Sequence, residues 1–211
     1  MIKYGLDVSY AQGKFDWSTV KKLNPDNIDF AIVRAGYGNN NIDAQAKRNF
    51  TELNRLGIPA GAYWFSYAYT RKMAANEAKC LLDFVKSYKI EYPLIFDFEY
   101  ASDNYAKKNG VNLSKSDISE LVDEFCQYLE RNGYYAMFYT NLEYKRNKFD
   151  TALFKRYDHW LAYYGKNNTH EGYMFQHTST GRLKGHNGNL DLDYTTRDYP
   201  TIIKKAGLNN L

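Results

Sequence analysis

Two carboxylates separated by one aromatic residue close an apolar run of the sequence. Residues 92–99 read YPLIFDFE, and apolar runs of this length bounded by turn signals are typical of buried strands. Because side chains alternate across a strand, Asp97 and Glu99 are expected on one face. Burying two acids without a cation raises the pKa of at least one of them. One ionised and one protonated carboxyl side by side is the arrangement used in glycoside hydrolysis. The alternative is a strand-end pair that only caps or salt-bridges neighbouring loops.

Further acids occupy the first and last predicted strands. Asp7 lies within 4–9 (YGLDVS), and Asp191 and Asp193 lie two residues apart within 190–195 (LDLDYT). In a closed barrel the first and last strands are neighbours, so Asp7 is expected to approach Asp191. Crowded acids raise one another's pKa, which keeps a general acid protonated near neutral pH. A divalent metal site is the rival reading, but inward Tyr and Trp outnumber the polar groups that would complete its shell, so no metal or other cofactor is expected.

The elements that carry these acids alternate between apolar strands and amphipathic helices. The pattern predicts strands over 4–9, 30–38, 60–69, 92–99, 134–141, 159–164, 173–178 and 190–195. Helices are predicted over 16–23, 43–56 with Asp43 as the cap, 70–88, from Ser114 or Ser116 to 132, 149–157 and 199–206, with a polar loop over 100–113. This order predicts an α/β fold, an irregular TIM-like barrel of eight strands with reduced helices in its last third. Residues 1–211 are expected to form a single catalytic domain, with the chemistry at the carboxyl ends of the strands.

Composition limits the classes of function. Aromatic residues make up 17% of the 211 residues, with 21 Tyr, and surplus Tyr suggests a lined groove of the kind that carbohydrate sites use. The formal charge of +4 favours approach to an anionic polymer such as a cell wall. No block of Lys or Arg indicates a nucleic-acid partner, and no run is apolar enough for a membrane span.

The cysteines and the start of the chain bear on the cellular compartment. Cys80 and Cys126 lie in helical patterns without metal-ligand spacing, so buried free thiols are expected, with a disulfide between adjacent helices as the alternative. Met1 leads directly into the first strand, without the features of a signal peptide. We expect synthesis in the cytoplasm and, from the function inferred below, action on the cell wall.

Several segments together resemble the glycoside hydrolase family 25 lysozymes, the Chalaropsis-type N-acetylmuramidases common among bacteriophage endolysins. The matching segments are GLDVSYAQG, FAIVRAGYG, GAYWFSYA, PLIFDFE, MFYTN, WLAYY, FQHTSTG and NLDLDYT. They occur in the family's order and cover essentially the whole chain. The resemblance implies an irregular barrel whose closing strands are partly antiparallel. It also implies cleavage of the β-1,4 bond between N-acetylmuramic acid and N-acetylglucosamine in peptidoglycan.

The resemblance also implies roles for individual residues. Glu99 would be the general acid/base, and Asp97 either a nucleophile or the group that orients the substrate's own N-acetyl group. Asp7 and Asp191 would shape the charge of the site. Retention through the substrate's acetamido group is favoured, although carboxyls two residues apart also fit the separations of about 5–5.5 Å or about 6.5–9.5 Å of the two-carboxylate mechanisms.

The expected substrate-binding residues are Tyr63, Tyr139, Trp160, Gln176, Asp193 and Arg34, where Arg34 is favoured as a buried partner of the acids, or of backbone carbonyls, over a clamp on substrate. The chain departs from the family in two places: it reads Phe-Gln-His around Gln176, where the family more often has Trp-Gln-Tyr, and it has Asp193 where the family usually has Asn. The alternatives are a glycosidase for another N-acetyl-sugar polymer such as chitin, and a non-catalytic glycan-binding barrel, which would typically have lost the acid. A monomer or weak oligomer is expected.

Overall fold

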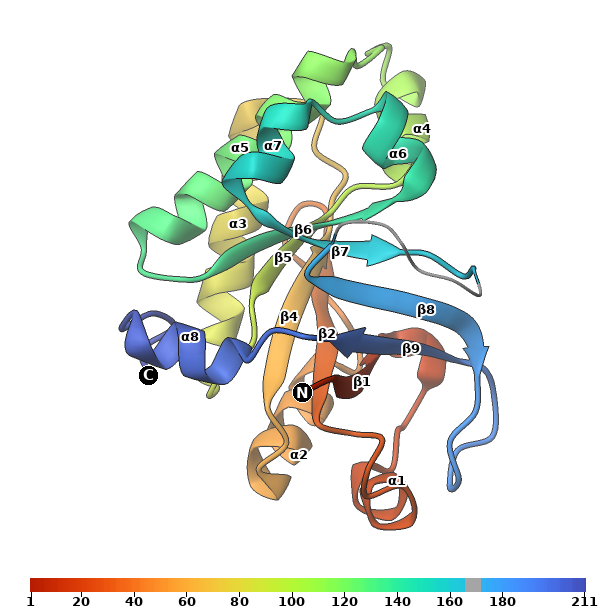
Figure 1. Cartoon of the computed structure of the whole chain (residues 1–211). Coiled ribbons are helices and arrows are strands. Elements are labelled where there is room, and N and C mark those ends of the chain that lie inside the picture. Colours follow the sequence, from red (N-terminus) through yellow and green to blue (C-terminus); the bar gives the residue numbers. More distant parts are fainter. Residues whose placement is uncertain (166–171) are drawn as a thin grey trace.

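Eight strands close into a barrel in the computed structural model, which describes residues 1–165 and 172–211 (Figure 1). Around the barrel the order is β1, β9, β8, β7, β6, β5, β4, β2, and the barrel closes by the pairing of β1 with β2. The eight strands are β1 (Lys3–Val8), β2 (Phe30–Tyr37), β4 (Ala60–Phe65), β5 (Leu94–Asp97), β6 (Ala136–Asn141), β7 (Asp158–Ala162), β8 (Met174–Gly181) and β9 (Leu190–Thr195). The prediction of an eight-stranded TIM-like barrel is confirmed.

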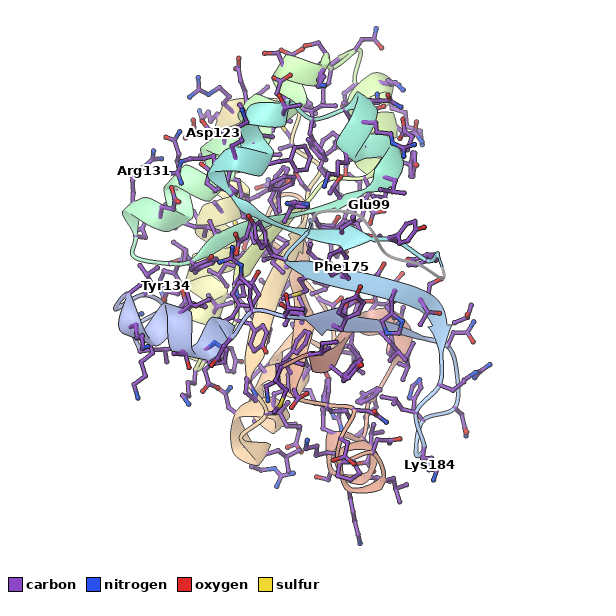
Figure 2. All side chains as sticks on the ribbon, in the orientation of Figure 1. Glu99, Asp123, Arg131, Tyr134, Phe175 and Lys184 are labelled. Carbon is purple, nitrogen blue, oxygen red and sulfur yellow. The ribbon has the colours of Figure 1, made fainter. Side chains whose placement is uncertain are left out.

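One strand of the barrel, β9, runs against its neighbours. It pairs antiparallel with both β8 and β1, whereas the other pairings around the barrel are parallel. The tip of the β8–β9 hairpin reaches α1 (Trp17–Leu23), where Asn24 exchanges two hydrogen bonds with the backbone of Lys184 (Figure 2). Because β9 is reversed, its first residues lie at the same barrel end as the last residues of the parallel strands.

Helices cover the outside of the barrel between the parallel strands. They are α2 (Ala46–Leu56), α3 (Arg71–Val85), α4 (Tyr100–Lys108), α5 (Lys115–Arg131), α6 (Leu142–Asn147), α7 (Thr151–Arg156) and α8 (Tyr199–Lys205), with the short η1 (Tyr10–Gln12) after β1. The apolar stripe of α5, with Leu121 and Phe125, is buried. Ser114, one of the two predicted starts, caps α5, and Gly57 ends α2 in the left-handed conformation. No helix in the described part of the chain has the length and apolar character to cross a bilayer.

The barrel interior follows the two-residue period of the strands. Alternate residues such as Ile32, Tyr63, Ile95 and Met137 form an inner core, while the residues between them pack against the helices. Tyr199 of α8 belongs to the same inner core, so this helix closes the end of the barrel opposite the carboxyl ends of the strands. The filled interior leaves only the other end open for a site.

Three expectations about local structure were wrong, and some short elements were not predicted. Residues 100–108 form α4 rather than a polar loop. Asp43 does not cap α2, whose first residue is Ala46; its carboxylate binds Arg34 instead. The short β3 (Asn41–Ile42) and α6 were not predicted. The strand predicted over 60–69 ends at Phe65 because Ser66 bends away to bond with α3.

The two cysteines are free thiols. Cys126 is buried, as expected, whereas Cys80 is half-buried. The alternative of a disulfide between helices is therefore wrong.

Candidate active site

A pocket of about 270 Å³ opens at the carboxyl ends of the parallel strands. Of the ten site residues expected from the sequence, nine line it: Asp7, Arg34, Tyr63, Asp97, Glu99, Tyr139, Trp160, Gln176 and Asp191. We refer to it as the acid pocket. These residues come from β1, β2, β4, β5, β6, β7, β8 and β9 and from the start of α4, so closure of the barrel is what brings them together.

The strand period explains why the acids point inward. Ile95 lies in the inner core, and Asp97, two residues later on β5, is directed to the same side. The strand predicted over 92–99 ends at Asp97, so Glu99 lies two residues beyond β5 and directly before α4. Its backbone N–H donates to Ser102 Oγ at 3.0 Å, and its carbonyl accepts from Asp103 N. The start of α4 therefore fixes the backbone of Glu99 at the rim of the barrel, where Figure 2 shows it.

Burial raises the pKa of both Asp97 and Glu99. The pKa of Asp97 is raised well above its usual value, first by burial and then by the neighbouring Glu99 and Asp7 carboxylates, while Arg34 lowers it. The pKa of Glu99 is also raised, mainly by burial, with a further contribution from Asp191. Both shifts favour retention of a proton by the pair at a higher pH than for two separate, exposed carboxyls.

Asp7 and Asp191 form a second pair of acids across the pocket. They are direct partners in the register of β1 with β9. Burial and then the charge of Asp191 raise the pKa of Asp7 well above its usual value, and burial raises the pKa of Asp191. Asp7 and Asp97 are buried, whereas Asp191 and Glu99 are half-buried. Two acids therefore lie at the bottom of the pocket and two at its rim.

Gln176 connects the acids to the aromatic wall. Its amide nitrogen donates to Asp7 Oδ2 at 2.7 Å. Its amide oxygen accepts from the hydroxyls of Tyr139 at 3.2 Å and Tyr164 at 2.6 Å. This one side chain therefore orients a carboxylate and two rings, as a buried polar network does when its members are satisfied.

Asp193 lies beneath the acid pocket rather than in its wall. It is 0% exposed, and its Oδ1 accepts from the indole N–H of Trp160 at 2.9 Å. Burial and the charge of Asp7 raise its pKa well above the usual value. The sequence placed Asp193 among the substrate-binding residues, but in this structure it offers no surface to a sugar. Asp191 and Asp193 are successive inward positions of β9, and Asp193, the later one, lies deeper in the barrel.

Arg34 is the cation of the site. Its Nε donates to Asp43 Oδ2 at 2.8 Å, and its charge lowers the pKa of Asp97. The hydrogen bond of Arg34 is thus with Asp43 rather than with one of the four pocket acids, and 14% of its side chain is exposed. Among residues 1–165 and 172–211, no group of three or more His, Cys, Asp or Glu has an arrangement that could hold a metal ion.

Two lining residues, Phe65 and Tyr164, were not among the site residues expected from the sequence. Phe65 is the last residue of β4, and Tyr164 lies just after β7. The available signal was position, because aromatic residues at the carboxyl ends of barrel strands face the mouth.

The sequence of the chain is similar to those of known proteins. Residues 6–186 match the family model described as "Glycosyl hydrolases family 25". Lysozyme M1 of Streptomyces globisporus is 24% identical over 203 residues, which cover 89% of this chain and 65% of that protein. The uncharacterized protein YegX of Escherichia coli K12 is 26% identical over 198 residues, covering 90% of this chain and 68% of YegX.

The fold also matches solved structures. The modular autolysin LytC of Streptococcus pneumoniae, solved with a synthetic peptidoglycan ligand, superposes with a TM-score of 0.80 and 26% identity. The match covers 92% of this chain and 46% of LytC, so the chain spans about half the length of that protein.

Proposed function

The chain belongs to the glycosyl hydrolases family 25, and on that premise we propose that it is a peptidoglycan hydrolase of the lysozyme type. It cleaves the β-1,4 bond between N-acetylmuramic acid and N-acetylglucosamine. The observation that carries this proposal is the convergence of Asp7, Asp97, Glu99 and Asp191 in one pocket at the carboxyl ends of the barrel strands. Lysozyme M1 and the peptidoglycan-bound LytC, both similar to this chain, support the substrate class.

Glu99 is the proposed general acid/base. It is half-buried at the rim, and burial raises its pKa, which favours the protonated form that a general acid needs to give a proton to the glycosidic oxygen. As the bond breaks, positive charge develops on the sugar ring. The surrounding carboxyl groups, Asp7 and Asp191 among them, stabilise this charge when they are in their ionised form.

Asp97 is the proposed orienting group for the substrate's acetamido side chain. An amide N–H that reaches Asp97 needs an acceptor, so substrate binding favours the ionised form of Asp97 and moves the shared proton to Glu99. The acetamido oxygen then attacks the anomeric carbon as Glu99 protonates the leaving oxygen. A water molecule then attacks the anomeric carbon of the resulting cyclic intermediate, and Glu99 takes a proton from this water. The product keeps the original configuration.

The aromatic wall and the polar network are proposed to hold the sugar. Tyr63, Tyr139 and Trp160 provide ring surface in the pocket. Gln176 holds Tyr139 and Asp7 in fixed orientations. Asp193 supports Trp160 from beneath, so its proposed contribution to binding is indirect.

Product analysis tests the proposal. Purified peptidoglycan and chitin are each incubated with the protein, and the new reducing ends are identified by mass spectrometry after reduction. The proposal predicts release from peptidoglycan with N-acetylmuramic acid at the reducing ends. N-Acetylglucosamine ends, or faster release from chitin, would replace it with a different glycosidase, and binding without release would indicate a non-catalytic barrel.

A further inference from the structure

Glu77, on α3, is a buried acid outside the acid pocket. Only 2% of the residue is exposed, and within residues 1–165 and 172–211 it forms no ion pair. A buried carboxylate without a cation is unfavourable unless hydrogen bonds compensate. An apolar side chain would pack α3 against the barrel without this penalty. An acid that breaks the rule for buried positions points to a task other than stability.

Both oxygens of the Glu77 carboxylate bind the turn that follows β4. Oε2 accepts from Ser66 Oγ at 2.6 Å, and Oε1 accepts from the Tyr67 N–H at 2.9 Å. The Ser66 hydroxyl oxygen in turn accepts from the Ala68 N–H at 3.1 Å. Because β4 ends at Phe65, a side chain from a helix fixes residues 66–68.

The same turn is bonded to the backbone of Asp97. The Ser66 N–H donates to the carbonyl oxygen of Asp97 at 2.7 Å. This bond lies one residue beyond Phe65 and Asp97, the last register pair of β4 with β5. Asp97 is also the last residue of β5. The bond therefore fixes the end of the strand at the point where its acid enters the pocket.

The carboxyl group of Asp97 depends on this backbone contact for its position. Its Oδ1 is buried, and no donor in the described part of the chain forms a hydrogen bond with it. Asp7, by contrast, accepts from the Gln176 amide at 2.7 Å. Since its own side-chain atoms are held less firmly than those of Asp7, Asp97 is placed by the end of β5, which Ser66 holds from the β4 side.

We propose that Glu77 is a positioning residue for the reaction. Through Ser66 it fixes the carbonyl group of Asp97, and it thereby holds the Asp97 carboxyl group where it orients the substrate's acetamido group. This inference rests on the proposed function, because the role of Asp97 is taken from it. Glu77 does not touch the substrate. Its contribution is the geometry of the reacting groups, in which an error of about 1 Å can lower the rate about 100-fold.

Steady-state kinetics on soluble peptidoglycan oligosaccharides test this role. In Glu77→Ala the turn loses both acceptors, so kcat is expected to fall about 10- to 100-fold while KM changes less than about twofold. Glu77→Gln should restore kcat, because its amide oxygen accepts from the Tyr67 N–H and its amide nitrogen donates to Ser66 Oγ. The matched control is Val85→Ala, at the last position of α3 and buried. It should lower stability and leave kcat unchanged.

A second variant tests whether the effect passes through Ser66. Ser66→Ala removes the hydroxyl group that joins Glu77 to the turn, so it should also lower kcat. The double variant Glu77→Ala/Ser66→Ala should be about as slow as Glu77→Ala alone, because the effects of residues that act as one unit are not additive. Losses that multiply in the double variant would overturn the proposed route.

Amide hydrogen exchange, measured by NMR, reports the link between Glu77 and Asp97 without the reaction. Exchange of the Ser66 N–H is compared with that of the Asn209 N–H, which is bonded to a different part of the backbone. The Ser66 exchange rate, relative to that of Asn209, should rise in Glu77→Ala and stay unchanged in Glu77→Gln.

The role of Glu77 and the proposed function are judged by different results. If the unmutated protein releases product but Glu77→Ala has a normal kcat, or an unchanged relative exchange rate of Ser66, the role of Glu77 is overturned and the hydrolase is retained. If the unmutated protein releases no product, the hydrolase is rejected. The exchange rates then still decide whether Glu77 holds the backbone of Asp97.

Discussion

Asp7 and Asp191 lie directly opposite each other in the antiparallel pairing of β1 with β9. The reversal of β9 makes this possible, because it brings the first residues of that strand to the carboxyl ends of the others. The charge of Asp191 contributes to the raised pKa of Asp7 and also to that of Glu99. The closing strand of the barrel therefore helps to keep the proposed acid protonated.

Replacing Asp191 tests this electrostatic link. In Asp191→Asn a negative charge near Glu99 is lost, ionised Glu99 becomes less unfavourable, and its pKa falls. The alkaline limb of the profile of kcat/KM against pH reports the general acid of the free enzyme, so it should move to lower pH. The control Asp26→Asn, in an exposed loop, should leave the profile in place. The electrostatic link would be contradicted if the alkaline limb of Asp191→Asn lay at the same pH as that of the unmutated protein, or at a higher pH.

Asp193 is predicted to support Trp160 by a hydrogen bond that an amide can replace. In Asp193→Leu the buried indole N–H loses its acceptor, which should lower the free energy of unfolding by about 1–3 kcal/mol. Asp193→Asn keeps an acceptor and should lose much less. The comparison is made by urea unfolding at pH 7. Equal losses in the two variants would mean that the bond of Asp193 with Trp160 contributes nothing to stability.

Glu77 is predicted to make stability depend on pH. Burial raises its pKa from 4.5 to about 7 in the folded protein. A folded-state pKa above the unfolded value means that its contribution to stability is fully present below pH 4.5 and is lost as the pH rises through 7. The loss amounts to about 3 kcal/mol.

The measurement is a series of urea unfolding curves between pH 4 and pH 8. Glu77→Gln can still accept from the Tyr67 N–H but carries no charge, so its stability should fall less over this range than that of the unmutated protein. Because other buried acids also titrate, the quantity that decides is the difference between the two proteins at each pH. A constant difference would show that Glu77 does not titrate as stated.

The barrel and most of its acid pocket could be predicted from local sequence patterns. Apolar runs located the strands, and the two-residue period placed Asp97 and Glu99 on one side. Position within the strand order placed Asp7 beside Asp191. These inferences succeeded because each needs only one strand, or the general rule that a barrel joins its first strand to its last.

The remaining features depend on contacts between distant segments. Asp43 looks like a helix cap in the sequence, but Arg34 and the Tyr10 N–H, brought beside it by the barrel, compete for its carboxylate. Asp193 is buried because its inward-facing position lies deep inside the barrel. The alternation of side chains along a strand predicts that it faces inward but not how deep it lies. Helix α4 has no strong apolar stripe, so the hydrophobic pattern did not predict it. Its start is held by the hydrogen bond from the Glu99 N–H to Ser102 Oγ, which is seen only in the structure.

The most direct test of the account is the rate of peptidoglycan solubilisation by Glu99→Gln. General acid/base catalysis contributes about 100- to 10,000-fold, so the variant should be slower by that factor while its circular dichroism and melting temperature remain those of the unmutated protein. The matched control, Glu120→Gln on the exposed face of α5, should solubilise peptidoglycan at the normal rate. A folded Glu99→Gln protein that works as fast as this control would contradict the assignment of Glu99 as the acid, and with it the proposed mechanism.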